Sequence, residues 1–384
     1  MKDIVFVFCE GCYPVPAIKG GAVEYLTQML LDQNEIHHKY NFHVIMCKSF
    51  DDKTVYDYSK YKNTKFYDFY QSNFKFKLDK YINAVNKRLN YSLPLKSKYE
   101  NFIIQTILKI NPDFIIFEGS FNASVRFLTK NFGKEKMILH VHHQIALKKH
   151  IDKYFGNMLC VSNFIKNDWI ESKKLSNNFN YIVLPVALKE RFVDEGQIEL
   201  IKKQYNIKKD DYIVAFCGRL IKEKGVDILI KAINNLNNRK IKLLIIGGSE
   251  FKGSKQTPYI KYLQGLVNGR NNIIFTGYID NDKLFNYYMV ADLLVVPSIC
   301  NESANLVSLE GRKLGLREIV TRSGGMPEYC SKSAKILDIN DDLEKTLTQE
   351  ILAEYKTGKQ QKTPEKVDDE KDYFKNFCKL FWVL

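Results

Sequence analysis

Short apolar runs alternate with longer amphipathic stretches along this chain, and the alternation occurs twice. In the first half, runs rich in β-branched and aromatic residues occupy residues 4–8, 43–47, 114–117, 137–141 and 158–161. In the second half they occupy residues 212–217, 242–246, 273–275, 293–296 and 319–321. Such uninterrupted runs are typical of strands buried on both faces of a parallel sheet. Stretches between them, such as residues 22–31 and 99–110, read as helices, so we predict two doubly wound α/β domains.

A chain of 384 residues is long enough for two such domains. We place their boundary after a further predicted strand at residues 181–184. The expected domains are residues 1–185 and residues 186–365, followed by a C-terminal helix at residues 366–384. Residues 358–371 are polar and charged, which predicts a linker or a loose surface segment. Residues 372–381 are aromatic and amphipathic and predict a helix that docks back on the first domain.

The surface is basic, with a formal net charge of +14. A polyanion, an anionic membrane face or a phosphorylated small molecule would fit this charge, and so would a lysine-rich composition with no bound anion. No zinc-finger, RRM-like or helix-turn-helix signature accompanies the charge, so we expect no nucleic-acid partner. Residues 74–88 mix lysines with apolar side chains and predict a basic amphipathic helix. That helix would suit an anionic membrane surface, or be an ordinary surface helix with extended lysines.

We expect the protein to be cytoplasmic. If its basic surface binds a membrane, we expect it to be peripheral on the inner face of that membrane. The opening run at residues 4–8 is too short for a secretory signal, and no apolar stretch approaches the roughly 20 residues that span a bilayer. Several of the eight cysteines fall in predicted strands, as small buried residues of a reducing compartment do. Cys9 and Cys12 form a CxxC with no second pair to complete a zinc site. These two cysteines are therefore interpreted either as part of a strand end with a turn or as a redox pair.

Two cations follow the apolar run at residues 212–217. Gly218 allows a tight exit from the predicted strand, Arg219 and Lys224 come next, and a helix is expected to begin near Val226. The planar fork of an arginine and the point charge of a lysine suit a diphosphate at the carboxyl end of a parallel sheet. A common strand–loop–helix junction with surface cations is the alternative.

Two carboxylates, Glu302 and Glu310, are separated by seven residues. Glu302 falls in a loop after a predicted strand, and Glu310 falls on a helix expected to start at about Ala304. This spacing lets the two acids reach opposite ends of a bound nucleotide sugar, whose hydroxyls donate hydrogen bonds to carboxylates. The backbone N–H groups of Asn305 and Leu306, at the helix N-terminus, would point at the phosphates. Two solvated acids beside a helix start are the alternative.

The order of these residues resembles that of the retaining glycosyltransferases of family GT4, the glycosyl transferases group 1, whose acids follow the pattern Glu-x7-Glu. Members have the GT-B architecture, in which two Rossmann-like doubly wound domains face a central cleft. The landmarks that occur here in the family's order are Gly218-Arg219-Leu220 with Glu223-Lys224-Gly225, residues 244–248, Phe275-Thr276-Gly277-Tyr278-Ile279, Ala291-Asp292, Pro297-Ser298 and Gly324-Gly325-Met326-Pro327-Glu328.

The first half of the chain agrees with this resemblance. In the family, the loop after the first strand brings glycine backbone close to the donor diphosphate and sugar; here it contains Gly20 and Gly21, with Ala22 opening the next helix. A plain turn is the alternative for these glycines. The preceding Pro-Val-Pro-Ala is similar to members that build bacterial surface polysaccharides or glycosylate spore coats. In the family, one strand ends in a histidine beside the reaction centre. His142 takes that place here, with His143 as the alternative; a structural histidine is the other interpretation.

The resemblance implies a role for each of these side chains. Arg219 and Lys224 would bind the diphosphate and stabilise the leaving nucleotide. Glu302 would hold hydroxyls of the donor sugar, and Glu310 the hydroxyls of the ribose. His142 would orient the donor sugar near its anomeric carbon.

The remaining implied contacts are made by the backbone. Tyr278 and Ile279 would hold the base, and Ala304, Asn305 and Leu306 would lie at the phosphates. The implied site contains no cofactor and no catalytic metal, because the cations neutralise the departing diphosphate. No carboxylate nucleophile is evident, so the resemblance implies retention through a front-face, oxocarbenium-like path.

Two stretches depart from the family pattern. Residues 311–318 replace the usual small-residue helix and its proline, which changes the packing of the helix that carries Glu310. Residues 184–187 replace the usual Asn-Gly-Val-Asp at the domain crossover. Neither departure removes a predicted contact residue.

The expected function is that of a retaining hexosyltransferase (EC 2.4 type) that moves a sugar from a nucleotide-sugar donor, expected to be a UDP-sugar, to a glycan or lipid-linked acceptor. Its expected setting is surface polysaccharide or glycoconjugate synthesis. The alternative is a catalytically silent GT-B subunit that binds glycan or stabilises a partner transferase. A GT-B epimerase or phosphorylase is disfavoured, because no epimerase acid/base set and no pyridoxal-phosphate lysine is recognisable.

Overall fold

The structure is a computed structural model of the 384-residue chain. It describes residues 1–383 except 11, 19, 73, 76–77, 79–80, 82–83, 86–96, 145–150, 173–178, 250–255 and 268. The chain forms two compact units. Unit 1 comprises Met1–Ala187 together with Asp369–Leu384, and unit 2 comprises Leu188–Asp368. Each unit is described below by itself.

Unit 1 is built on a seven-stranded parallel sheet in the order β3-β2-β1-β4-β5-β6-β7. Its strands are β1 (Lys2–Phe8), β2 (Tyr40–Ser49), β3 (Thr64–Gln71), β4 (Phe114–Glu118), β5 (Met137–Val141), β6 (Asn157–Cys160) and β7 (Asn180–Val183). Its described helices are α1 (Ala22–His37), α3 (Lys98–Ile110), α4 (Ser124–Phe132), α5 (Asn163–Glu171) and α12 (Glu370–Val383), with 3₁₀ turns at Lys134–Lys136 and Ile151–Lys153.

Unit 2 is built on a six-stranded parallel sheet in the order β10-β9-β8-β11-β12-β13. Its strands are β8 (Tyr212–Cys217), β9 (Ile241–Ile246), β10 (Ile273–Gly277), β11 (Leu293–Val296), β12 (Arg317–Thr321) and β13 (Lys335–Leu337). Its helices are α6 (Glu195–Gln204), α7 (Val226–Leu236), α8 (Pro258–Val267), α9 (Leu284–Val290), α10 (Leu306–Leu314) and α11 (Leu343–Thr357), with 3₁₀ turns at Lys222–Lys224 and Met326–Glu328.

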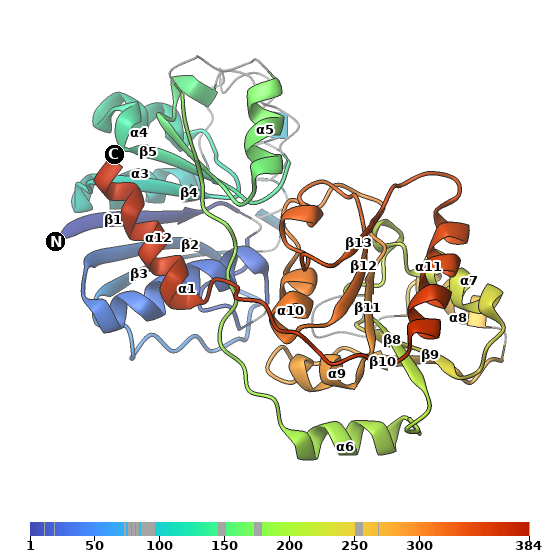
Figure 1. Cartoon of the computed structure of the whole chain (residues 1–384). Coiled ribbons are helices and arrows are strands. Elements are labelled where there is room, and N and C mark those ends of the chain that lie inside the picture. Colours follow the sequence, from blue (N-terminus) through green and yellow to red (C-terminus); the bar gives the residue numbers. More distant parts are fainter. Residues whose placement is uncertain are drawn as a thin grey trace. The chain divides into compact units, whose positions relative to one another are not determined.

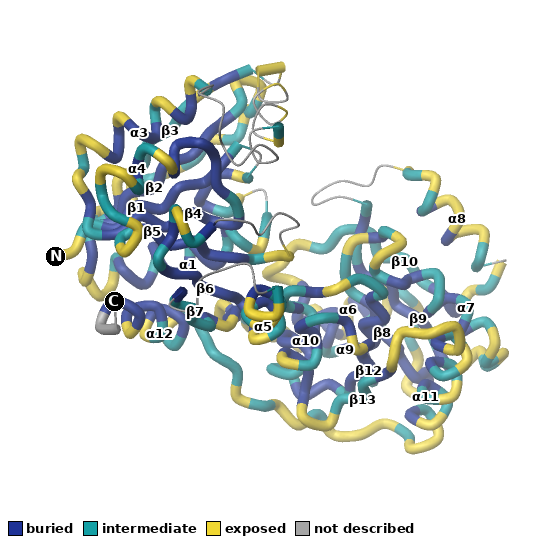
Figure 2. The backbone as a smooth tube through the Cα atoms, turned by 90° about the horizontal axis from the view of Figure 1, so that it is seen from above, coloured by how far each residue is buried: buried dark blue, intermediate teal, exposed yellow. Residues whose placement is uncertain are grey.

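Both sheets confirm the predicted doubly wound α/β class. Two strands were not predicted. β3, the half-buried edge strand of its sheet, mixes pairs of aromatic residues with charged and polar ones, so it forms no continuous apolar run. β13 has three residues, too few for a period to be recognised. In each unit the strands form the buried centre of the fold, and the outer helix faces and loops are exposed (Figure 2).

The last helix, α12, packs on unit 1 beside α1 (Figure 1). Phe377 stacks on Phe6 of β1 with 6.1 Å between ring centroids, and Phe381 lies 4.8 Å from the ring of Phe114. Phe374, Phe377 and Phe381 of α12 all contact Tyr40 edge-on. The aromatic stretch near the end of the chain therefore completes the core of the first unit.

The polar segment that precedes α12 is not loose, which corrects the expectation for residues 358–371. Thr363 N–H donates to the carbonyl of Gly315 at 3.1 Å, and Glu365 N–H donates to the carbonyl of Arg312 at 3.1 Å. The Arg312 side chain also pairs with the Glu365 carboxylate at 2.9 Å. Sequence polarity gave no sign of these backbone bonds, which fix the segment to the end of α10.

Among the described residues, no helix is both long and apolar enough to cross a membrane. The predicted basic amphipathic helix at residues 74–88 lies largely outside the described residues. Its interaction with a membrane surface stays a prediction.

Candidate functional site

The predicted donor-binding residues of unit 2 lie at the carboxyl edge of its sheet. β8 and β11 are neighbours in the sheet, and the chain winds away from them in opposite directions. In open α/β sheets a crevice for ligands forms at the carboxyl ends of two such strands. Arg219 and Lys224 follow β8, whereas Glu302 and Glu310 follow β11. The topology therefore brings both cations and both acids to the edge where ligands bind.

Lys224 and Glu302 are in direct contact. The Lys224 ammonium lies 2.5 Å from Oε1 of Glu302, and the Ser298 hydroxyl donates to the same oxygen at 2.7 Å. The two side chains of the pair are 20% and 11% exposed. Within the described residues Oε2 of Glu302 accepts no hydrogen bond, so it is the oxygen left for a ligand hydroxyl.

The loop that carries Glu302 is held by backbone contacts. Ile299 N–H donates to the carbonyl of Glu223 at 2.9 Å, which joins it to the loop of Lys224. Gly325 N–H donates to the carbonyl of Glu302 at 2.6 Å. Gly225 packs so closely on this loop that a Cβ there would lie 2.1 Å from the Pro297 carbonyl oxygen. The ion pair is thus built on rigid backbone.

Glu310 is held by different partners from those of Glu302. Arg191 lies 2.5 Å from its Oε1, and the Tyr288 hydroxyl donates to its Oε2 at 2.9 Å. The side chains of Arg191 and Glu310 are 10% and 5% exposed, so this is a buried ion pair. A carboxylate offers about four lone-pair directions, so Glu310 can accept further hydrogen bonds while it keeps both partners.

The other predicted residues of unit 2 lie along the same edge. Arg219 is exposed, and its side chain makes no hydrogen bond or ion pair with the described part of the chain. Tyr278 and Ile279 directly follow β10 and are half-buried. Ala304 and Asn305 precede α10, which begins at Leu306 and not at Ala304, because the Asn305 side chain caps it by accepting from Ser308 N–H at 2.9 Å.

The stretch 311–318 that departs from the family pattern supports α10 through an unusual contact. Glu318 of β12 is buried beneath Gly311, where a Cβ would lie 2.6 Å from its Oε1. Glycine at this helix position makes room for the carboxyl group, whose Oε2 accepts from Ser331 N–H at 3.3 Å. Burial raises the pKa of Glu318 to about 8.

This buried acid makes the stability of unit 2 dependent on pH. In the unfolded chain Glu318 loses its proton above about pH 4.5, whereas in the folded protein it keeps the proton until about pH 8. The free energy of unfolding therefore falls as the pH rises from 4.5 to 8. We expect Glu318→Gln to flatten the fall by about 2 kcal/mol or more. Urea unfolding at pH 5 and pH 8.5 measures it, with the exposed Glu195→Gln as matched control. Equal falls in wild type and Glu318→Gln would contradict the prediction.

In unit 1 the predicted glycines lie at the end of the loop before α1. Gly20 and Gly21 have φ angles of 85° and 104°, in the region that favours glycine, and exposed Ala22 begins the helix. The buried Glu24 carboxylate lies beneath the loop and accepts from Tyr13 N–H at 2.8 Å. Burial raises the pKa of Glu24 to about 7.

His142 follows β5 and is bound to a buried acid. Its Nε2 lies 2.7 Å from Oε2 of Glu118, the last residue of β4, and Nδ1 of His140 lies 3.1 Å from the same oxygen. Burial, with a smaller effect of the neighbouring His140, lowers the pKa of His142 to about 4. His142 is therefore neutral at physiological pH. The alternative histidine, His143, is exposed.

Glu118, His140 and His142 each offer one ligand atom for a metal ion, and these atoms lie within 4.8 Å of one another. The second nitrogen of a ligating histidine normally donates a hydrogen bond that fixes the ring. Nε2 of His140 is buried without a partner among the described residues. The hydrogen bonds to Glu118 account for the arrangement, and we assign no metal to it.

Sequence reasoning gave no role to four side chains of these clusters. Ser298 was recognised only as part of a family landmark, Tyr288 belongs to a segment of apolar character, and Arg191 lies in a stretch without periodicity. Glu118 had a usable signal, because an acid that ends one parallel strand lies beside the last residues of the neighbouring strand. The observed register pairs Glu118 with His140.

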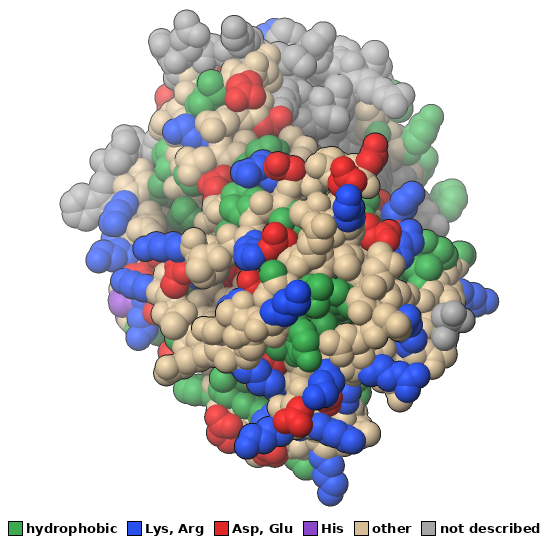
Figure 3. Space-filling model, turned by 45° about the vertical axis from the view of Figure 1, so that its right-hand side comes forward, with side chains coloured by type: hydrophobic (Ala, Val, Ile, Leu, Met, Phe, Trp, Pro, Cys, Tyr) green, Lys and Arg blue, Asp and Glu red, His purple; other side chains and the backbone are tan. Residues whose placement is uncertain are grey.

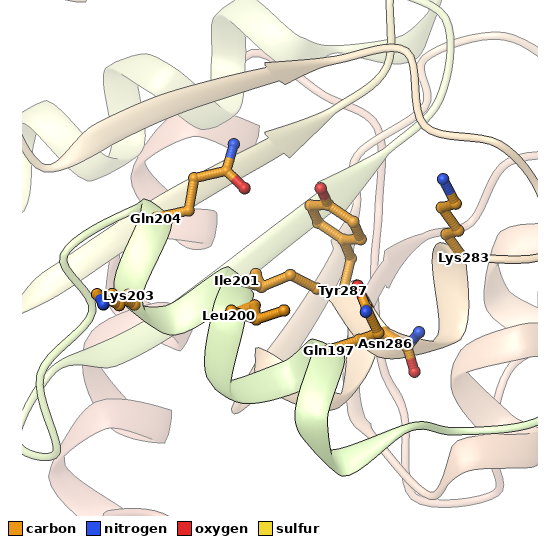
Figure 4. A pocket seen from close by; sticks show the side chains of 8 residues that line it. All are labelled: Gln197, Leu200, Ile201, Lys203, Gln204, Lys283, Asn286 and Tyr287. Atoms are coloured by element: carbon orange, nitrogen blue, oxygen red, sulfur yellow. The ribbon is translucent and has the colours of Figure 1, made fainter.

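A pocket of about 730 Å³ lies between α6 and α9 of unit 2 (Figure 4). Its lining residues are Gln197, Leu200, Ile201, Lys203, Gln204, Lys283, Asn286 and Tyr287. None of the predicted site residues lines it, and we assign it no ligand. On the face shown in Figure 3, Lys and Arg side chains lie at several separate places with acids between them, and do not form one patch.

Comparison with known proteins finds a family match for the second half of the chain. Residues 197–379 match the family described as glycosyl transferases group 1. Over 198 residues, or 50% of this chain and 51% of the relative, the sequence is 24% identical to lipopolysaccharide 1,2-N-acetylglucosaminetransferase of Salmonella typhimurium. The chain thus spans about half the length of that curated relative.

Solved structures share the fold over nearly the whole chain. A glycosyltransferase from Rickettsia africae has a TM-score of 0.70 at 20% identity, covering 92% of this chain and 88% of that one. Anabaena HepE, solved with UDP and glucose, has a TM-score of 0.66 at 13% identity, covering 100% of both chains. The parallel sheets, the order of the motifs and these matches lead to one conclusion: the chain has the GT-B fold, and its residues 197–379 match the glycosyl transferases group 1.

Proposed function

We propose that this chain is a retaining glycosyltransferase that moves a sugar from a nucleotide-sugar donor to a glycan or lipid-linked acceptor. The observation that carries the proposal is the Lys224–Glu302 pair at the switch point of unit 2, with one carboxylate oxygen left free. A cation beside a hydroxyl-binding acid suits a sugar joined to a phosphate. The family match over unit 2 supports the same chemistry.

The diphosphate is the group these cations serve. The Lys224 ammonium has three N–H donors and uses one on Glu302, and the exposed Arg219 guanidinium has no protein partner among the described residues. The first-turn N–H groups of α10, beginning with Leu306, precede the helical hydrogen-bond ladder and favour an anion. As the bond to the sugar breaks, negative charge grows on the departing diphosphate, and fixed cations stabilise it without a metal.

The sugar and the nucleoside are proposed to be held by the two acids and the strand ends. Oε2 of Glu302 accepts from a hydroxyl of the transferred sugar, and Glu310 accepts from the ribose. The backbone of Tyr278 and Ile279 contacts the base. In unit 1, Gly20, Gly21 and His142 are proposed to act on the same donor.

UDP is the nucleotide we propose, because HepE, whose fold this chain shares, was solved with UDP and glucose. The relative named as a lipopolysaccharide N-acetylglucosaminetransferase supports a surface-glycan acceptor. Retention, the absence of a catalytic metal and a cytoplasmic, membrane-peripheral location complete the proposal.

The proposal is tested by nucleotide release from a panel of UDP-, GDP- and ADP-sugars without acceptor. We expect slow hydrolysis of one donor, lost in Lys224→Ala and in Glu310→Gln. Glutamine is chosen at position 310 because alanine would leave Arg191 charged and buried without its partner. Lys240→Ala is the matched control, since Lys240 is exposed and precedes β9, at the opposite edge of the sheet.

If no donor is hydrolysed, calorimetric titration with UDP, GDP, ADP and the same panel of sugar nucleotides decides between the remaining functions. Binding that is lost in Lys224→Ala would keep the transferase and make the acceptor essential. No binding of any nucleotide would overturn the transferase and leave the silent glycan-binding subunit. Product anomers analysed by NMR would separate retention from inversion.

A further inference from the structure

The buried cluster Glu118–His140–His142 of unit 1 contains more than the single histidine that the sequence singled out. The side chains of Glu118, His140 and His142 are 1%, 3% and 7% exposed. Glu118 ends β4, and His140 is its register partner on β5. The backbone N–H of Gly119 donates to the carbonyl of His140 at 2.8 Å, which fixes the two strand ends against each other.

The hydrogen bonds of this cluster determine where its protons lie. Burial alone would raise the pKa of Glu118, but the two histidines reverse that effect and hold the pKa well below its usual range. The carboxylate is therefore ionised and can only accept hydrogen bonds. Two imidazole nitrogens face the carboxylate, Nδ1 of His140 and Nε2 of His142, and each must therefore carry a hydrogen.

The opposite nitrogen of His142 is consequently a lone-pair acceptor. A neutral imidazole has one N–H and one bare nitrogen, so an Nε2–H ring presents Nδ1 without a proton. Nδ1 of His142 has no hydrogen-bond partner among the described residues. Nε2 of His140 also has none, but that atom is fully buried, whereas Nδ1 of His142 is not. Among the side-chain nitrogen and oxygen atoms of the cluster, it is the one that is neither paired with a described residue nor fully buried.

We infer that Glu118 is a positioning residue: it fixes His142 as the Nε2–H tautomer, so that Nδ1 accepts a hydrogen bond from a hydroxyl of the sugar substrate. This inference rests on the proposed function for its substrate, but not for the position of the proton. It also excludes a role for His142 as a proton donor at Nδ1, because that nitrogen carries no hydrogen.

Glu118 is proposed to fix the tautomer of His142, which the packing of the ring alone does not do. A ring held only by packing can exchange tautomers, and an Nδ1–H ring would present a donor to the same hydroxyl. The buried carboxylate makes that tautomer costly, because the bare Nε2 would then face an anion. His140, bound to the same oxygen, restrains the carboxylate from turning away.

The test combines NMR of the imidazole nitrogens with steady-state kinetics. In ¹⁵N-histidine-labelled full-length protein at pH 7.5, we expect His142, assigned from the signal lost in His142→Gln, to show a solvent-protected Nε2–H and a bare Nδ1. In Glu118→Ala that protection is lost, and kcat for the donor identified above falls about tenfold or more while KM changes little. Glu118→Asp restores part of both. Glu135→Ala, an exposed acid before β5, is the matched control.

Two results would overturn the inference. One is an Nδ1–H resonance for His142 in the wild-type protein, and the other is wild-type kcat in a folded Glu118→Ala variant. Because the NMR measurement needs no substrate, it remains decisive if the wild type transfers no sugar. A protected Nε2–H in a protein that neither transfers sugar nor binds a nucleotide would overturn the proposed function and leave the tautomer fixed by Glu118 in place.

Discussion

Replacing Lys224 with alanine is expected to lower kcat for sugar transfer by about 100- to 1,000-fold, with a much smaller change in KM. The ammonium lies at the switch point where the diphosphate is proposed to depart, and its contact with Glu302 at 2.5 Å holds it there. Charge on the leaving group is largest in the transition state, so the lost interaction appears mainly in kcat. Initial rates over a range of donor concentrations at saturating acceptor measure both constants.

Lys240→Ala removes the same charge at the opposite edge of the sheet and should leave both constants within about twofold. A double-mutant cycle with Glu302→Gln separates the two functions of Lys224. If Lys224 served only to hold Glu302, the double variant would be no slower than Glu302→Gln alone. A folded Lys224→Ala variant with kcat within threefold of wild type would remove Lys224 from the reaction.

The substitution Gly225→Ala is expected to destabilise unit 2 by about 3 kcal/mol or more and to abolish nucleotide binding. Gly225 has a φ angle of 66°, which an alanine adopts only with strain, and its Cβ would lie 2.1 Å from the carbonyl oxygen of Pro297. The Cβ position is fixed by the backbone of residue 225 and the oxygen belongs to the backbone of Pro297, so no side-chain rotation can relieve the clash. The loop from Pro297 to Glu302 must move, and Lys224 with it.

Chemical denaturation and calorimetric titration with UDP measure the two parts of this effect. Gly265→Ala is the control, because Gly265 lies within α8 and nothing stands within 4 Å of its Cβ position. That variant should change stability by less than about 1 kcal/mol, in the stabilising direction. Similar behaviour of the two alanines would show that the close approach at Gly225 has no consequence.

Most strands were predictable because they are continuous apolar runs, with β3 and β13 as the exceptions. The positions of Lys224 and Glu302 followed from where those runs end. Parallel topology brings such ends to one edge. That the two side chains touch was not predictable, since they are 78 residues apart and the strand order β8-β11 had to be known first.

The partners of Glu310 were even harder to predict from the sequence. Arg191 is 119 residues away in sequence and belongs to no periodic element, and Tyr288 reads as one of several aromatic core residues of α9. A pattern finds residues that recur at a fixed spacing; it does not find a single side chain whose position depends on how a loop crosses a helix. Glu118 lay between these cases, because the strand register could have suggested it.

Unit 1 is assembled from both ends of the chain, and this affects its biosynthesis. On the ribosome the strands of unit 1 emerge first, but the aromatic side chains of α12 that cover Phe6 and Tyr40 are made only after all of unit 2. Until then a large apolar face is open to solvent, to chaperones and to other nascent chains. Unit 2 has no such dependence, because its residues are contiguous. The first unit to begin synthesis is therefore the last that can finish folding.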